Sequence, residues 1–381
     1  MRILHTSDWH LGRSLHRADL RAAQAAFLDH LVGVVRAEKV DAVLVAGDVY
    51  DRAVPPVDAV GLCEDALFRL RDAGARIVLT SGNHDSARRL GFGASLFART
   101  GVHLRTRPGA LAEPVLLEDR HGTVAVYGVP YLEPDAVRGE LPGAPGGHAG
   151  VLGHAVGRIR ADADARGARR RVVIAHGWVT GGAASESERD ITVGGTGQVP
   201  AGLFDGFSYV ALGHLHGQQA VDGHLRYSGS PLPYSFSEAS HRKGSWLVEL
   251  DAAGLRRAET IPAPAYRRLS VLRGRLADLL GSPAYAGYAD DFVSVTLTDP
   301  GRPQAAMDAL RARFPHVLVL GFEPEGAAPD SRGYRARVAG RGDLEIAGQF
   351  VAHVRNSPAT EGETKLLREA FAAVRAGEEP S

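Results

Sequence analysis

The sequence of 381 residues has a single cysteine, Cys63, within the helical pattern "AVGLCEDALF". One cysteine cannot form a disulfide inside the chain, which excludes a disulfide-stapled secreted domain and favours a reducing compartment. We therefore interpret Cys63 as a small core residue. The sequence shows no signal-peptide pattern and no apolar run long enough to cross a bilayer, so we expect a cytoplasmic protein with no membrane partner.

Lysine is also scarce: Lys39, Lys243 and Lys365 are the only lysines among 44 basic residues. The formal net charge is zero, because 44 acidic residues balance the basic ones. This balance argues against a protein that coats nucleic acid through bulk charge, although local arginine clusters remain possible. A Walker loop of the form GxxxxGK[ST] is absent too, so any dependence on ATP has to come from a partner.

The first two thirds of the chain alternate short apolar runs with helical patterns. "RILHTS", "DAVLVAGD" and "ARIVLTSGN" are typical of buried strands, and helical spacing separates them. Further strands, "TVAVYGVPY", "RRVVIAHGW" and "FSYVALGH", follow more closely and indicate a second sheet. The sequence therefore predicts an α/β fold in which two sheets form a sandwich flanked by helices.

The prolines of "AETIPAPAYRRLS" predict a domain boundary near residue 262. After it, "RLSVLRG", "DFVSVTLTD" and "HVLVLGFEP" read as strands of a small α/β domain over residues 263–335. Residues 336–381 contain two amphipathic helices. Residues 1–262 are then the main domain.

Residues that commonly bind metals stand where the predicted strands end, usually beside a glycine. They come from five strands and are Asp8, His10, Asp48, Asn83, His84, His176, His214 and His216. Most of these motifs alone are more simply polar strand ends, and only "GNHD" is as well read as a metal motif, so the prediction rests on the whole ordered set. In α/β sheets, sites form at the carboxyl ends of strands, and side chains at i and i+2 of a strand point to the same side.

Without His84 the set offers seven candidate ligands, too many for one ion that must leave room for a substrate. Two ions fit better if one carboxylate bridges them. Imidazole, carboxylate and amide groups without a thiolate favour manganese, iron or zinc over a structural zinc site. Two such ions, roughly 3.5–4 Å apart, are the usual apparatus for cleaving phosphoesters.

The motifs "DWHLG", "GDVYD", "GNHD", "AHGW" and "GHLHG", in this order, resemble those of calcineurin-like metallophosphoesterases. The chain is more narrowly similar to SbcD nuclease subunits through "SESERDITVGGTGQVPAGLFDGFSYVALGHLHG", "YSGSPLPYSFSE" and the closing helices. This resemblance implies two manganese ions. Asp8, His10 and His216 would hold one ion, Asn83, His176 and His214 the other, and Asp48 would bridge them. His84 would face the scissile phosphate instead of binding metal.

The narrower resemblance also implies a function and partners. SbcD-type subunits cleave DNA as double-strand exonucleases and as single-strand or hairpin endonucleases, in repair, recombination and replication. Their partner is SbcC, an ATPase with coiled-coil arms, in a two-plus-two heterotetramer. Here the apolar faces 344–354 and 366–374 are the expected SbcC surface, unless they pack on their own domain. The expected homodimer region is 56–100, with Leu62, Phe68, Leu90 and Phe97.

DNA contacts are less well defined by the sequence. Arg52 resembles the phosphate-binding arginine of Ser/Thr protein phosphatases, although a salt-bridged loop arginine is the simpler interpretation. Arginines that could bind phosphate form two clusters, Arg166, Arg169, Arg170 and Arg171, and Arg267, Arg268, Arg273 and Arg275. The second cluster lies in the small domain, which in this family caps the site and meets DNA.

Two other functions remain open at this point. The chain could be another metallophosphoesterase, such as a protein phosphatase or a small-molecule phosphodiesterase, but the appended domain and closing helices argue against this. It could also be a non-catalytic scaffold for SbcC, but the complete set of ligands argues against that.

Overall fold

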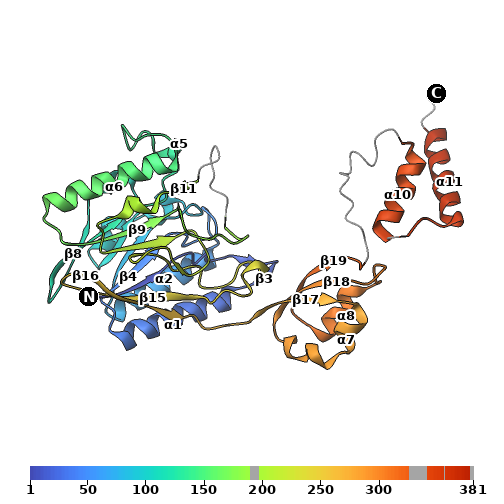
Figure 1. Ribbon diagram of the computed structural model, residues 1–381, viewed down its shortest axis with the longest axis horizontal. Helices are drawn as coiled ribbons and strands as arrows, with labels where there is room; N and C mark the ends of the chain where they lie inside the picture. Colours follow the sequence, from blue (N-terminus) through green and yellow to red (C-terminus); the bar gives the residue numbers. More distant parts are fainter. Residues whose placement is uncertain (189–196, 326–340, 356, 378–381) are drawn as a thin grey trace. The chain divides into compact units, whose positions relative to one another are not determined.

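The computed structural model describes residues 1–188, 197–325, 341–355 and 357–377 (Figure 1). The chain divides into two compact units, Met1–Tyr266 and Arg267–Ser381. This division lies directly after "PAPAY", a few residues beyond the boundary near residue 262 that the prolines predict. The predicted boundary between residues 335 and 336 lies outside the described residues.

The first unit contains two six-stranded sheets. The order in the first sheet is β16-β15-β1-β4-β5-β6, in which β1, β4, β5 and β6 run parallel. Strand β15 is antiparallel to β1, and β16 is antiparallel to β15. Its strands are β1 Arg2–Thr6, β4 Ala42–Ala46, β5 Arg76–Thr80, β6 Val102–Arg105, β15 Gly244–Asp251 and β16 Gly254–Pro262.

The second sheet has the order β13-β14-β12-β9-β8-β7. Four neighbours, β14, β12, β9 and β8, are parallel, and antiparallel strands β13 and β7 close the two edges. Its strands are β7 Val115–Asp119, β8 Gly122–Gly128, β9 Arg170–His176, β12 Tyr209–Gly213, β13 Gln219–Ala220 and β14 Leu225–Tyr227.

The two sheets pack face to face, and helices cover their outer faces (Figure 1). Leu44 of β4 and Ile174 of β9 share the core between the sheets. Val43 and Val45 instead contact helices α1 (Arg21–Glu38) and α2 (Val57–Asp72), and α6 (Gly147–Ala165) covers the second sheet. Because both faces of these strands are buried, they read as continuous apolar runs. The predicted sandwich flanked by helices is confirmed, and Cys63 is buried in α2.

Short elements complete the first unit. They are β2 Ser14–Leu15, β3 Ala18–Asp19, β10 Trp178–Val179, β11 Gln198–Val199, α3 Ala87–Leu90, α4 Ala94–Ala98, α5 Pro134–Val137, and the 3-10 helices η1 Pro108–Ala110, η2 Ala201–Phe204 and η3 Phe236–Glu238.

The second unit contains a parallel sheet of order β17-β18-β19 with its own core, which includes Val293, Leu310 and Phe314. Two helices follow it, and their exposed side chains include Phe350 and Leu366. The elements are β17 Leu269–Gly274, α7 Leu276–Gly281, η4 Pro283–Tyr288, β18 Phe292–Leu297, α8 Ala306–Arg313, β19 Val317–Phe322, α10 Asp343–Arg355 and α11 Glu361–Gly377. Among the described residues, no helix is both long and apolar enough to span a membrane.

One arginine of the first cluster, Arg170, is used inside the fold, whereas Arg166 and Arg169 are exposed. Arg170 is 3% exposed, and its guanidinium binds both carboxylate oxygens of Asp119 at 2.6 and 2.9 Å. These hydrogen bonds hold the pKa of Asp119 below its usual range. Because the buried Arg170 side chain connects the start of β9 to the end of β7, it is not available to DNA.

Candidate metal centre

The predicted ligands lie at the carboxyl ends of parallel strands in both sheets. Asp8, Asp48 and Asn83 follow β1, β4 and β5 of the first sheet, whereas His176 ends β9 and His214 follows β12 of the second. The ends of these strands meet at one edge of the sandwich, where the Nε2 atom of His176 lies 3.4 Å from Oδ2 of Asp48. The topology therefore gathers residues separated by up to about two hundred positions into one site.

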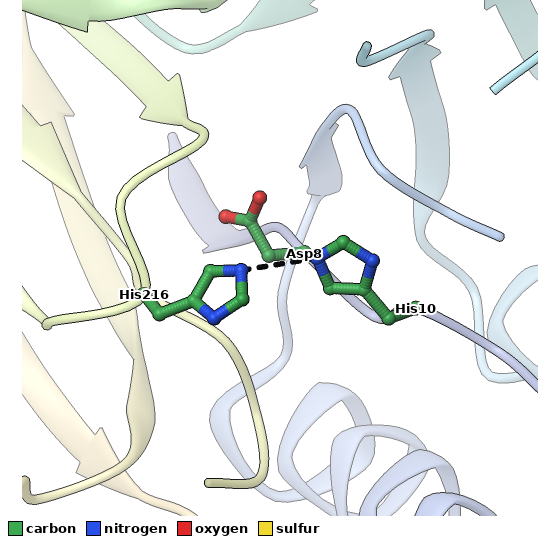
Figure 2. A group of neighbouring side chains, drawn as sticks. All are labelled: Asp8, His10 and His216. Carbon is green, nitrogen blue, oxygen red and sulfur yellow. Dashed lines mark hydrogen bonds between the residues drawn. The ribbon is translucent and has the colours of Figure 1, made fainter. Parts of the chain in front are cut away.

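Asp8, His10 and His216 form the first group of potential ligands (Figure 2). One ligand atom from each lies within 4.8 Å of the others, and all three residues are at most 1% exposed. The Nε2 atoms of His10 and His216 are 3.1 Å apart and aim at each other. Two converging imidazoles beside a buried carboxylate are a donor set that suits a divalent cation.

His176, Asn83 and His214 form the second group. Oδ1 of Asn83 lies 2.9 Å from Nε2 of His176 and 3.3 Å from Nδ1 of His214. Asp48 stands between the two groups, since its Oδ2 atom is also 3.7 Å from Nε2 of His10. This is the position that a bridging carboxylate requires.

The backbone at the site is strained. Asp8, His10, Asp48 and His214 adopt positive φ angles of 51°, 45°, 48° and 105°, and they are four of the eight non-glycine residues in the described parts of the chain that do so. Such conformations cost of order 1–3 kcal/mol each and cluster at functional sites. Together with the converging donor atoms, this strain indicates a site shaped for a ligand, and the residues fit two divalent ions.

The ring orientations are set by contacts behind the ligand atoms. His176 donates its Nδ1–H to the carbonyl of Ala46 at 2.9 Å, which leaves Nε2 as the ligand atom. His84 likewise donates Nδ1–H to the carbonyl of Asp51 at 2.8 Å. Oδ1 of Asp48 accepts the backbone N–H of His84 at 2.8 Å, so Oδ2 remains for the ions.

Burial shapes the protonation of the site. It lowers the pKa of His214 to about 3 and the pKa of His10 well below its usual value, so both rings are neutral, as metal ligands must be. Burial also raises the pKa of Asp8 to about 6. Burial alone would lower the pKa of His176, but the Asp48 carboxylate raises it to about 9. Bound cations would replace the His176 proton as the partner of Asp48.

Residues 1–218 match the family model of calcineurin-like phosphoesterases. The chain belongs to this family. It is therefore a metal-dependent phosphoester hydrolase, a class that binds two divalent metals, and Asp8, His10, Asp48 and His176 could hold them.

Solved structures similar to this metallophosphoesterase include TT1561 of Thermus thermophilus, with 16% identity over 68% of this chain and 98% of that chain and a TM-score of 0.40. GAP50, the anchor in the inner membrane complex of Plasmodium, has 9% identity over 86% of this chain and 98% of that chain and a TM-score of 0.35.

The metallophosphoesterase site brings together all eight residues that the sequence places at strand ends, including His84. The His84 ring is half-buried and lies 4.7 Å from the His10 ring, centre to centre. Asp85, which could have oriented His84, is used differently. Its carboxylate accepts the backbone N–H groups of Val49, Tyr50 and Gly82, and burial raises its pKa to about 7. The carbonyl of Asp51, and not the neighbouring Asp85, holds the His84 ring.

Arg52 lies at the margin of the site. It is 80% exposed, and its Nε atom is 3.5 Å from Oδ2 of Asp51. This is the salt-bridged loop arginine of the simpler interpretation, although an exposed pair of this kind is weak and leaves the guanidinium available to phosphate.

Sequence reasoning missed the residues that support His216, namely Ser187, Glu188, Glu238 and Lys243. The only sequence signal was indirect. The stretches "SESERD" and "YSFSE" belong to the narrower family resemblance, and Lys243 is a rare lysine in a chain that otherwise uses arginine.

Proposed function

We propose that this metallophosphoesterase is an SbcD-like nuclease subunit that hydrolyses DNA phosphodiester bonds with two manganese ions. One observation carries the proposal. A complete two-ion site is followed by a second unit that ends in two helices with exposed apolar side chains. Hydrolysis of a small phosphoester needs only the first of these parts, whereas a nuclease that works with an ATPase has a use for both.

Asp48 and His84 have different roles in the proposed reaction. When bound, the two ions supply Lewis-acid activation of the attacking water and of the phosphoryl oxygens. Asp48 presents Oδ2 between both ligand groups. His84, whose Nδ1–H donates to the carbonyl of Asp51, can donate from Nε2 to a phosphoryl oxygen or to the departing sugar oxygen when its ring is protonated. The His84 ring lies beside the His10 ring, so Nε2 of His84 is near the residues that would hold the first ion.

The arginines of the second unit are the proposed DNA contacts. Arg268 and Arg275 are 73% and 52% exposed and lie 3.3 and 2.7 Å from Asp291 and Glu325. Arg273 pairs with Glu323, and Arg267 donates to the carbonyl of Asp290. The pairs of Arg273 and Arg275 are exposed on both sides and contribute little, so a DNA phosphate can compete for these two guanidiniums.

Exposed apolar side chains support the proposed partners. On α10 and α11, Phe350, Val354, Leu366 and Val374 are 45–65% exposed, which suits docking on an SbcC-type ATPase. The proposed homodimer region, 56–100, also exposes Val57, Phe68, Phe92, Leu96 and Phe97. Leu62 and Leu90, which we also expected in that interface, are partly buried against the core.

Removal of residues 336–381 is expected to abolish binding to the SbcC-type partner and to leave metal-dependent nuclease activity. The reason is that every ligand of the site lies in the first unit. Co-purification of the two subunits measures binding. Leu366→Glu tests the same surface without truncation, and Lys365→Glu, a change on the same helix at an exposed cation, is the matched control. Tight binding by both the truncated chain and Leu366→Glu would contradict the assignment.

The substrate assay offers the purified protein, with manganese, end-labelled DNA, a phosphopeptide and a cyclic nucleotide, with and without the ATPase. The proposal predicts cleavage of DNA ends and hairpins and no turnover of the other two. Phosphatase activity without DNA cleavage would assign the chain to another branch of the family. No activity towards any substrate would point to a scaffold.

A further inference from the structure

His216 is held at every polar group that does not face the metal site. Its backbone N–H donates to Oε1 of Glu188 at 2.6 Å, and its carbonyl accepts from Nζ of Lys243 at 2.9 Å. Its Nδ1 atom lies 2.5 Å from Oγ of Ser187. Only Nε2 points at His10 and the first ligand group.

Ser187 connects the His216 ring to a buried ion pair. The Ser187 hydroxyl donates to Oε1 of Glu238, which in turn pairs with Lys243 through Oε2. A carboxylate only accepts hydrogen bonds, so the single hydroxyl hydrogen of Ser187 goes to Glu238. The Ser187 oxygen must then accept from Nδ1–H of His216, and this leaves Nε2 with a free lone pair. The chain Lys243–Glu238–Ser187–His216 thus selects the tautomer that binds metal.

Lysine suits this position better than arginine. The Lys243 side chain is 8% exposed, and its ammonium donates to three acceptors, the His216 carbonyl, Oγ of Ser230 and Oε2 of Glu238. An ammonium has three donors, so all of them are used, whereas a planar guanidinium has five in a fixed fork. In a chain with only three lysines, one of them occupies this buried site behind a metal ligand.

The two halves of the site are supported differently. Nδ1 of His176, in the second group, is held by the main-chain carbonyl of Ala46, which no side-chain substitution removes. The corresponding atom of His216, in the first group, depends on side chains from two separate segments, Ser185–Glu188 and Glu238–Lys243. A change in this network therefore acts on one half of the site.

We propose that Ser187, Glu238 and Lys243 are positioning residues that fix the His216 ring and thereby set the affinity of the ion held by Asp8, His10 and His216. The proposal rests on the two-ion site of the family and not on DNA as the substrate. Partners behind a metal ligand typically change metal affinity by about ten- to a hundredfold when removed.

The test measures manganese binding by calorimetry and by electron paramagnetic resonance in Ser187→Ala and Glu238→Gln. One of the two ions is expected to bind about ten- to a hundredfold more weakly, while the other changes by less than about threefold. Manganese-dependent hydrolysis of bis-p-nitrophenyl phosphate should fall and recover at high manganese concentration. Ser187→Thr, which keeps the hydroxyl, should bind both ions as tightly as the wild type. Lys243→Arg should weaken the same ion as Ser187→Ala does.

Glu369→Gln and Lys365→Met are matched controls, because Lys365 and Glu369 form an exposed pair on α11. Glu238→Gln leaves Lys243 buried without its partner and can weaken folding, but Ser187→Ala keeps that ion pair intact. Equal weakening of both ions, or unchanged affinity in Ser187→Ala, would overturn the proposal. Because metal binding and a generic phosphodiester are measured, failure to cleave DNA would count against the proposed function and not against this one.

Discussion

Asp48→Asn is expected to lower phosphodiester hydrolysis by about a thousandfold and to weaken the binding of both metal ions. Two bridged ions supply several kcal/mol of transition-state stabilisation, and each 1.4 kcal/mol is about tenfold in rate. Oδ2 of Asp48 lies 3.4 Å from Nε2 of His176 and 3.7 Å from Nε2 of His10. A neutral amide at this point removes the negative charge that both ion positions share.

Asparagine is the appropriate replacement because Asp48 has a φ angle of 48°, and asparagine adopts this left-handed conformation more readily than most residues. Its side-chain oxygen can still accept the backbone N–H of His84. Metal content after dialysis and the rate on bis-p-nitrophenyl phosphate provide the measurements, with the exposed Asp65→Asn on α2 as control. An Asp48→Asn protein that retained both ions and near-normal turnover would rule out a bridging role.

The sequence predicts the candidate site well because its signal is local. Each potential ligand stands directly after an apolar run, and parallel strands place their carboxyl ends at one edge of a sheet. The same rule applies to both sheets, so Asp48 and His176 could be grouped before their contact was known. The outer faces of the sandwich were predictable for a related reason, since strands such as Ala42–Ala46 are apolar on both sides.

The contacts behind the ligands were not predictable in this way. Ser187 and Glu238 are 51 positions apart, and neither lies on a strand that leads into the site. Their contact depends on how two loops pack, and no periodicity in the sequence reports that. Arg170 illustrates the same limit, because the sequence alone does not distinguish an exposed arginine of a basic run from one that is buried against Asp119.

His84→Ala is expected to lower the turnover of DNA by about a hundred- to a thousandfold while both ions remain bound. General acid–base groups contribute typically 10²–10⁴-fold, and the resemblance assigns His84 no ligand role. The ring is half-buried, so its loss leaves the Asp51 carbonyl within reach of water instead of stranded in a core. Single-turnover cleavage of end-labelled DNA and manganese titration measure the two properties separately, and His121→Ala, at an exposed histidine in the turn between β7 and β8, serves as control.

The choice of leaving group then separates the two roles open to His84. If Nε2 protonates the departing sugar oxygen, His84→Ala should slow DNA cleavage far more than cleavage of bis-p-nitrophenyl phosphate, because p-nitrophenolate departs without a proton. If His84 only binds a phosphoryl oxygen, both substrates should slow by similar factors. Loss of one manganese ion in His84→Ala would instead identify His84 as a ligand. This outcome is worth testing because ligand atoms of His84, His10 and Asp48 lie within 4.8 Å of one another. Wild-type rates on both substrates with both ions bound would remove His84 from the chemistry altogether.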